Sequence, residues 1–130
     1  MQTYQGSCHC GAVRYEVDAE LDTLTQCNCS ICTKKGALLL RVKPEQLRIL
    51  QGEADLQLYQ FNKKIARHFF CRHCGIHPFS NPRAAPDLYT INVRTLDGID
   101  PEAHEFTLRR FDGQNWEAAV DALNKGAKTT

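Results

Sequence analysis

Seven cysteines in three short clusters constrain the fold of this chain more than any other feature of its sequence. The N-terminal "MQTYQGSCHCG" lacks the charged-then-apolar order of a signal peptide, so we expect a cytoplasmic protein. Reducing compartments keep thiols free, which favours metal ligands or redox centres over disulfides. The clusters are Cys8 and Cys10 in "CHCG", Cys27, Cys29 and Cys32 in "CNCSIC", and Cys71 and Cys74 in "CRHCG".

The spacing of the clusters predicts one closed and one open metal site. Two of them are pairs that together supply four thiolates from distant parts of the chain, which is a complete tetrahedral shell for a structural Zn²⁺. The third is a trio at i, i+2, i+5, which can hold a second Zn²⁺ and leave its fourth position open, as catalytic zinc sites do. We therefore expect two Zn²⁺ per chain. The closed site would use Cys8, Cys10, Cys71 and Cys74, and the catalytic-type site would use Cys27, Cys29 and Cys32.

The ligand type of the trio predicts its chemistry. Three thiolates on a divalent ion leave a net charge near −1, so the ion is a weak Lewis acid and makes hydroxide from water poorly. A soft fourth ligand suits it better, namely a thiol bound as thiolate. We expect a small-molecule thiol as substrate, with its sulfur delivered to a carbon electrophile.

Other interpretations of the cysteines stay open. A histidine as fourth ligand would make the trio a second structural site, and the candidates are His68, His73, His77 and His104. The pair Cys71 and Cys74 also fits a redox dithiol, although no βαβ pattern surrounds it. An iron-sulfur cluster on four of the cysteines is a further possibility.

The remaining sequence predicts a mainly β protein with one domain over residues 1–130. Short segments rich in β-branched and aromatic residues, separated by turn signals, are typical of antiparallel sheets. A short turn is expected at Pro44–Leu47, and a C-terminal helix in "NWEAAVDALNKG", with Asn115 as its cap and Gly126 just past its end. The expected strands are Ala12–Val17, Ala37–Val42, Leu56–Phe61, Ile65–Phe70 and Leu88–Val93.

Charge and hydropathy argue against two classes of partner. The 16 basic and 15 acidic residues nearly cancel and are spread along the chain, so nothing favours nucleic-acid binding. No apolar run approaches the roughly 20 residues of a membrane span. The stretch Pro82–Pro86 predicts a stiff surface loop, which could gate a site if it borders the metal region.

The motifs "GSCHCGAVRYEV", "CNCSIC" and "FFCRHCG" resemble those of the glutathione-dependent formaldehyde-activating enzymes and their relatives, which include centromere protein V. The segments "NPRAAPDLYTINVRTLDGID" and "FDGQNWEAA" are more similar to the centromere protein V branch. The resemblance implies a Mss4-like antiparallel β fold, the same division of the cysteines between two zincs, and a carbon-sulfur lyase that condenses formaldehyde with glutathione.

The resemblance does not assign the residues that contact substrate. It also leaves a non-enzymatic function open, because the family includes relatives with non-enzymatic roles. That alternative is a non-catalytic, zinc-stabilised module that binds a protein partner; it predicts a fourth protein ligand on the trio and an exposed apolar patch. For the enzyme, one of Arg109 and Arg110 could bind a carboxylate, since neighbours on a strand point to opposite faces. Other candidate contacts at the open site are Ser30, Lys34, Lys35, His77 and Asn81.

Overall fold

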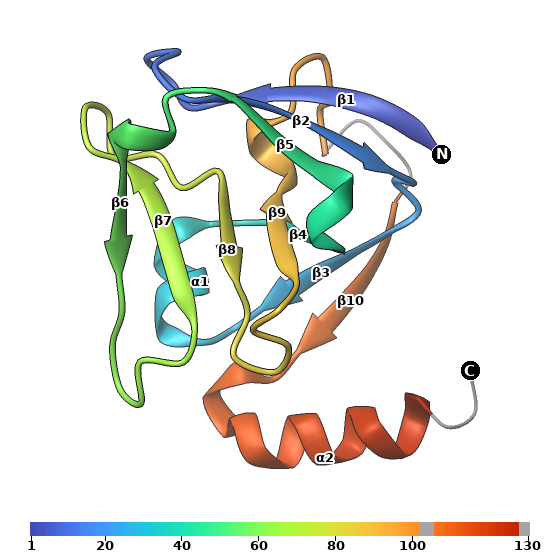
Figure 1. Cartoon of the computed structure of the whole chain (residues 1–130). Coiled ribbons are helices and arrows are strands. Elements are labelled where there is room, and N and C mark those ends of the chain that lie inside the picture. The colour runs from blue at the N-terminus through green and yellow to red at the C-terminus, as the bar shows by residue number, and fades with distance from the viewer. Residues whose placement is uncertain (102–105, 128–130) are drawn as a thin grey trace.

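The structure is a computed structural model that describes residues 1–101 and 106–127, without the side chains of 123–127. In this part of the chain the strands form a small, three-stranded sheet and a large, seven-stranded sheet (Figure 1). The small sheet has the order β1 (Gln2–Ser7), β2 (Arg14–Ala19), β5 (Leu47–Gln51). The large sheet has the order β10 (Thr107–Phe111), β3 (Thr23–Cys27), β4 (Leu39–Val42), β9 (Tyr89–Asn92), β8 (Phe79–Asn81), β7 (Arg67–Cys71), β6 (Leu56–Tyr59).

The small sheet buries one face and exposes the other. Along β2, Tyr15, Val17 and Ala19 are buried while the residues between them are partly exposed, which is the alternation of a strand packed on one side. The buried side joins the core that the two sheets share. That core consists of Tyr15, Val17, Ala19, Leu24, Leu38, Val42, Phe79, Ile91, Val93 and Leu96.

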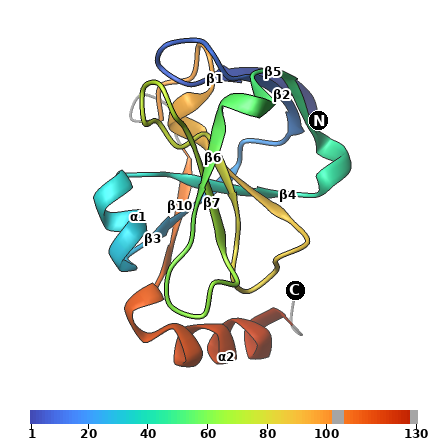
Figure 2. The same ribbon diagram turned by 60° about the vertical axis from the view of Figure 1, so that its left-hand side comes forward.

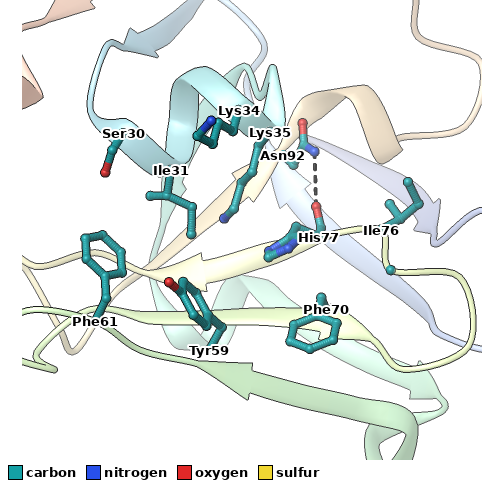
Figure 3. A pocket seen from close by; sticks show the side chains of 11 residues that line it. Ser30, Ile31, Lys34, Lys35, Tyr59, Phe61, Phe70, Ile76, His77 and Asn92 are labelled. Carbon is teal, nitrogen blue, oxygen red and sulfur yellow. Dashed lines mark hydrogen bonds between the residues drawn. The ribbon is translucent and has the colours of Figure 1, made fainter.

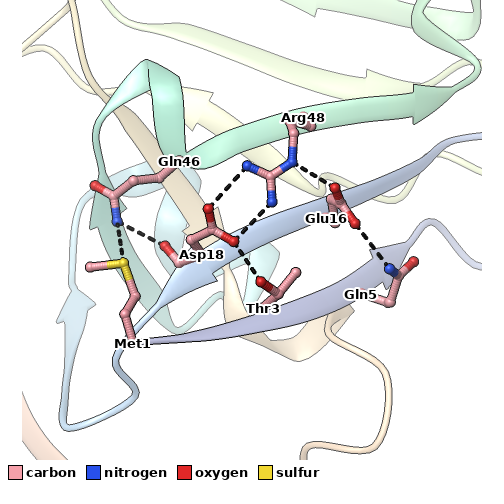
Figure 4. A network of polar contacts seen from close by, with 7 residues as sticks. All are labelled: Met1, Thr3, Gln5, Glu16, Asp18, Gln46 and Arg48. Carbon is pink, nitrogen blue, oxygen red and sulfur yellow. Dashed lines mark hydrogen bonds and ion pairs between the residues drawn. The ribbon is translucent and has the colours of Figure 1, made fainter.

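The outer face of the small sheet carries a network of polar contacts (Figure 4). Arg48 of β5 lies 2.6 Å from a carboxylate oxygen of Glu16 and 2.8 Å from one of Asp18, both on β2. Thr3 of β1 donates to Asp18 at 2.7 Å. The hydrogen bonds from Arg48, and then from Thr3, lower the pKa of Asp18 to about 2. The network therefore links all three strands, although exposed ion pairs stabilise a fold only slightly.

The large sheet has an apolar face and a polar face. Leu24, Val42 and Ile91 point into the shared core, and the alternation of a strand turns their neighbours to the other side. That other side carries Thr25 of β3, Arg41 of β4, Thr90 of β9, Ser80 of β8 and His68 of β7, all of which line one cavity. The polar face of this sheet is therefore the floor of a site.

The prediction of a mainly β fold with antiparallel sheets and a C-terminal helix is confirmed, with differences in detail. All five expected strands have counterparts. Among the described residues, five further strands were not expected: β1, β3 and β10 are rich in polar residues, β8 has 3 residues, and β5 lies just after the expected turn. β10 pairs with β3 in parallel, with Arg109 opposite Thr25, whereas only antiparallel pairing was expected. The parallel pair is possible because a long stretch of chain separates these two strands.

Within residues 1–101 and 106–127, two α-helices flank the sheets, α1 (Ser30–Lys35) and α2 (Trp116–Ala127). Residues 44–46 form the expected turn, η1 (Pro44–Gln46), and further single turns are η2 (Glu53–Asp55), η3 (Val93–Thr95) and η4 (Gly113–Asn115). The short α1 was not expected. Gly126 lies inside α2 rather than past its end, and Asn115 donates to Asp112 at 2.9 Å from the turn before the helix.

The helix α2 and the small sheet lie at opposite ends of the molecule in both views (Figures 1 and 2). The expected helical spacing is confirmed for Trp116, Ala119 and Val120, which are all partly buried; the side chain of Leu123 lies outside the described residues. None of the described helices is both long and apolar enough to cross a membrane.

Candidate functional site

Four thiols converge between the first turn of the chain and the end of β7. Cys8 and Cys10 lie in the turn from β1 to β2, and Cys71 and Cys74 lie at the end of β7 and in the turn after it. Their sulfurs all lie within 4.8 Å of one another, with 3.6 Å between Cys8 and Cys10 and 3.7 Å between Cys10 and Cys71. Four sulfurs at zinc bonding distance in a tetrahedron are about 3.8 Å apart. The four-thiol cluster therefore fits a zinc-sized ion.

Backbone amides surround this cluster. The Val13 amide donates to Cys8 Sγ at 3.3 Å and the His73 amide to Cys71 Sγ at 3.4 Å. Burial raises the pKa of Cys74, but backbone hydrogen bonds from Ile76 and Cys10 outweigh it and lower that pKa to about 6. Amides that stabilise thiolate charge are the usual surroundings of a metal-binding cysteine.

The remaining three thiols form a second cluster where β3 meets α1. Cys27 ends β3, Cys29 is the N-cap of α1, and Cys32 lies in its first turn. The three sulfurs lie within 4.8 Å of one another. The helix then ends at Gly36, whose φ of 64° is a left-handed conformation that glycine adopts without steric cost. A strand end and one short helix thus hold the trio.

The three thiols of the trio do not ionise independently. Hydrogen bonds from Cys27 and Cys32 lower the pKa of Cys29 to about 2, and its thiolate in turn raises the pKa of Cys27. The pKa of Cys32 is also raised, by Cys27 first and then by Cys29. Without a cation the three thiols therefore do not all ionise together, and a divalent ion that binds all three would have to displace protons.

A C-terminal segment clamps the trio from the other side. Asn28, between Cys27 and Cys29, donates to Asp112 at 3.0 Å and accepts from the Gln114 amide at 3.1 Å. Gly113 lies so close that a β-carbon there would be 2.7 Å from Cys27 Sγ and 2.7 Å from Cys29 Cβ. The trio therefore depends on the absence of a side chain at position 113.

The trio lines a cavity of about 470 Å³ over the polar face of the large sheet. None of the described lining residues is acidic, while five carry a positive charge. A cavity with this imbalance attracts anions. The five cationic residues are Arg41, Lys63, Lys64, Arg83 and Arg109.

Residues 3–109 match the family model of the glutathione-dependent formaldehyde-activating enzyme, GFA. The chain belongs to the GFA family. The matched range contains all seven cysteines of this GFA-family protein and ends at Arg109, so the clamp formed by Asp112, Gly113 and Gln114 lies beyond it.

The proteins similar to this GFA-family protein include one of known structure and one much longer relative. The crystal structure of a Rhodobacter sphaeroides protein superposes with a TM-score of 0.74 at 37% identity, covering 81% of this chain and 99% of the other. A Rhizorhabdus wittichii protein described as "Probable glycine dehydrogenase (decarboxylating) subunit 1" is 28% identical over 128 residues, which cover 91% of this chain. The match spans only 26% of that relative's length.

The four histidines considered as a fourth ligand lie apart from the trio or outside the described residues. No His, Asp or Glu in the described part of the GFA-family chain joins the trio's group of ligand atoms. His68 lines the same cavity, but its Nδ1 lies 3.1 Å from Lys35 Nζ. His73 contacts Asp55 at 3.0 Å, His77 lines a different cavity, and His104 is among the residues not described.

The expected substrate contacts divide between two cavities. Ser30 lines both, whereas Lys34, Lys35 and His77 line a second cavity of about 690 Å³ beside α1 (Figure 3). Burial, and then the Lys35 charge, lower the pKa of His77 to about 4. Asn81 lines neither cavity, because it is buried and donates to the Leu88 carbonyl at 2.8 Å.

Some lining residues of the trio's cavity were not found by sequence reasoning. Arg109 faces the cavity and Arg110 does not, which agrees with the expectation that at most one would. Arg41 and Thr90 were missed, and only their register across the sheet reveals them. Pro82 and Arg83 show that the expected stiff loop borders the cavity, and Arg83 packs 3.7 Å above the ring of Trp116.

Proposed function

We propose that this GFA-family protein is a zinc-dependent carbon-sulfur lyase or synthase that joins a small-molecule thiol, glutathione, to formaldehyde. The observation that carries the proposal is the trio: three thiols in a cavity wall, with no fourth protein ligand among the described residues. Family membership supports the reaction type. The four-thiol cluster has a different role in this proposal, because a complete shell leaves no position for a substrate.

Two zincs with separate roles fit the two clusters. Cys8, Cys10, Cys71 and Cys74 would hold a structural ion, and Cys27, Cys29 and Cys32 would hold the ion at the reaction site. When bound to the trio, the ion supplies a soft acceptor on which a thiol can be held as its thiolate. Imidazole ligands would leave a stronger Lewis acid, so the all-sulfur trio favours thiol chemistry over water activation.

The chain's own residues would position the reactants. The positive charges of the cavity attract the carboxylates of glutathione and offset the negative charge of the thiolates. Burial, followed by the Lys35 charge, lowers the pKa of His68 to about 4, so this cavity-lining side chain is neutral near pH 7. In the reaction, the thiol sulfur bonds to the carbonyl carbon and the thiol proton ends on the carbonyl oxygen, so the atoms balance without another reactant.

The alternative of a protein-binding module rests on the edge of the large sheet. Leu58 and Tyr59 of the edge strand β6 are about half exposed, and such an edge can pair with another chain. The alternative also requires the trio to be closed by a protein ligand, and the described residues offer none. The enzyme is therefore the better-supported function.

Zinc content and X-ray absorption at the zinc edge, with and without glutathione, test the proposal first. We expect two zincs per chain and an average ligand shell that gains sulfur and loses oxygen or nitrogen when glutathione is added. Cys29→Ser should then lower the rate of the formaldehyde reaction below detection. Four unchanged protein ligands at both ions would contradict the enzyme and support the protein-binding module instead.

A chelator should remove the two ions at different rates. The trio offers one protein ligand fewer than the four-thiol cluster and lines a cavity, so its ion should leave first. Metal analysis during a timed chelator challenge should pass through a state with one zinc per chain while the fold persists. Loss of both ions at equal rates would contradict the division into closed and open sites.

A further inference from the structure

Two residues of the cavity floor face each other across the β4–β9 pair. Arg41 and Thr90 are direct register partners, so their side chains project from the same face of the sheet, and both line the cavity of the trio. Arg109 is the register partner of Thr25, because β10 pairs with β3 in parallel, and both side chains line the same cavity. Three side chains that donate hydrogen bonds thus share one face, and they come from strands far apart in the sequence.

The Thr90 hydroxyl lacks a hydrogen-bond partner among the described residues. Thr90 is only 6% exposed, and its Oγ1 is buried without a hydrogen bond in the described structure. A buried polar group left unpaired destabilises the fold, because it loses its hydrogen bonds to water without replacing them. A ligand that accepts a hydrogen bond from Oγ1 would remove that cost, so the hydroxyl points to an occupant of the cavity.

Arg41 and Arg109 also lack an acidic partner in the described part of the chain. Neither forms an ion pair with a described residue, and no described residue lining the cavity is acidic. Arg41 and Arg109 place two like charges in the lining of one cavity, and burial, followed by the charge of Arg109, lowers the pKa of Arg41. The two guanidinium groups therefore repel each other. An anion bound between or beside them would relieve this repulsion.

The register also sets the size of the ligand. Thr25 pairs with Leu39, so Cys27 and Arg41 lie two residues beyond this pair in opposite directions along the antiparallel strands. Four residues of strand correspond to about 13 Å between their α-carbons. Because the Arg41 side chain spans part of this distance, a thiol held at the trio with its charged group at Arg41 would carry that group several bonds from the sulfur.

We propose that Arg41, Thr90 and Arg109 form a carboxylate-binding subsite that selects thiols with a carboxylate several bonds from the sulfur. The proposal rests on the proposed function and names the specificity of the same site. The carboxylate accepts hydrogen bonds from the Arg41 guanidinium and from Thr90 Oγ1, and Arg109 adds positive charge beside it. The subsite does not strengthen the binding of thiols that lack a carboxylate.

Binding of S-methylglutathione, measured by calorimetry, tests the subsite without turnover, because the methyl group blocks the sulfur. We expect Arg41→Gln and Thr90→Val each to weaken its binding about tenfold or more, as loss of a hydrogen bond to a charged group does. Two control variants should bind like the wild type. Thr90→Ser keeps the hydroxyl, and Arg110→Gln changes an arginine that does not line the cavity.

Stability measurements separate a binding role from a structural one. Thr90→Val removes an unpaired buried hydroxyl, so without ligand this variant should melt at the same temperature as the wild type or higher. Weakened binding together with unreduced stability is the expected signature. Wild-type protein that fails to bind S-methylglutathione, or variants that bind it equally well, would overturn the proposal.

Kinetics with two thiols distinguish failure of the subsite from failure of the proposed function. Arg41→Gln should raise KM for glutathione and leave KM for 2-mercaptoethanol, which has no carboxylate, unchanged. Wild-type turnover with an unchanged glutathione KM in Arg41→Gln would overturn the subsite alone. Arg41-dependent binding of S-methylglutathione without any turnover of formaldehyde would overturn the proposed reaction and leave the subsite standing.

Discussion

Cys74→Ser is expected to unfold the protein. Cys74 belongs to the four-thiol cluster that joins the first turn of the chain to the end of β7. A structural zinc contributes about 10–16 kcal/mol of binding free energy in small metal-binding folds, whereas whole domains are stable by about 5–15 kcal/mol. Because Cys74 is partly exposed, the substitution removes a ligand without burying a new hydroxyl. Circular dichroism on heating should show no cooperative transition.

Cys29→Ser provides the matched control for that experiment. It makes the same exchange of sulfur for oxygen at another partly exposed cysteine, but in the trio. We expect this variant to lose activity and the second zinc while it keeps a cooperative thermal transition. If both variants unfold alike, the trio is structural and the division of roles between the two clusters is wrong.

Gly113→Ala is expected to destroy the trio and leave the fold intact. The added β-carbon would lie 2.7 Å from Cys27 Sγ, closer than real side chains approach, so the trio or the clamp segment must shift. Asn28 is hydrogen-bonded to Asp112 and Gln114, which limits how the clamp can move away. A displacement of about 1 Å at a reaction site can lower the rate about 100-fold. Steady-state turnover and zinc content should therefore both fall.

Gly98→Ala separates this contact from the general effect of replacing a glycine. A β-carbon at Gly98 meets nothing within 4 Å, although the φ of 71° there is costly for alanine. We expect that variant to lose about 1–2 kcal/mol of stability and to keep both zincs and full activity. Gly113→Ala with two zincs and wild-type turnover would show that the clamp does not shape the site.

The division of the cysteines between two clusters followed from the sequence because metal ligation limits the possibilities. Four thiols complete a tetrahedral shell and the two cysteine pairs supply four, so Cys8 and Cys10 were expected to meet Cys71 and Cys74, as they do in the structure. The sequence also predicted the alternation along β2 and the helical spacing of Trp116, Ala119 and Val120. In each case the pattern lies within a few neighbouring residues.

The floor and the clamp of the site depend instead on contacts between distant residues. Arg41 becomes a neighbour of Thr90 only when β4 pairs with β9, and Arg109 joins them only through the parallel pairing of β10 with β3. Gly113 matters only because the chain returns to Cys27 after more than half its length. Local periodicity shows which face of a strand is buried, but the pairing of strands depends on the free energy of the whole packed core.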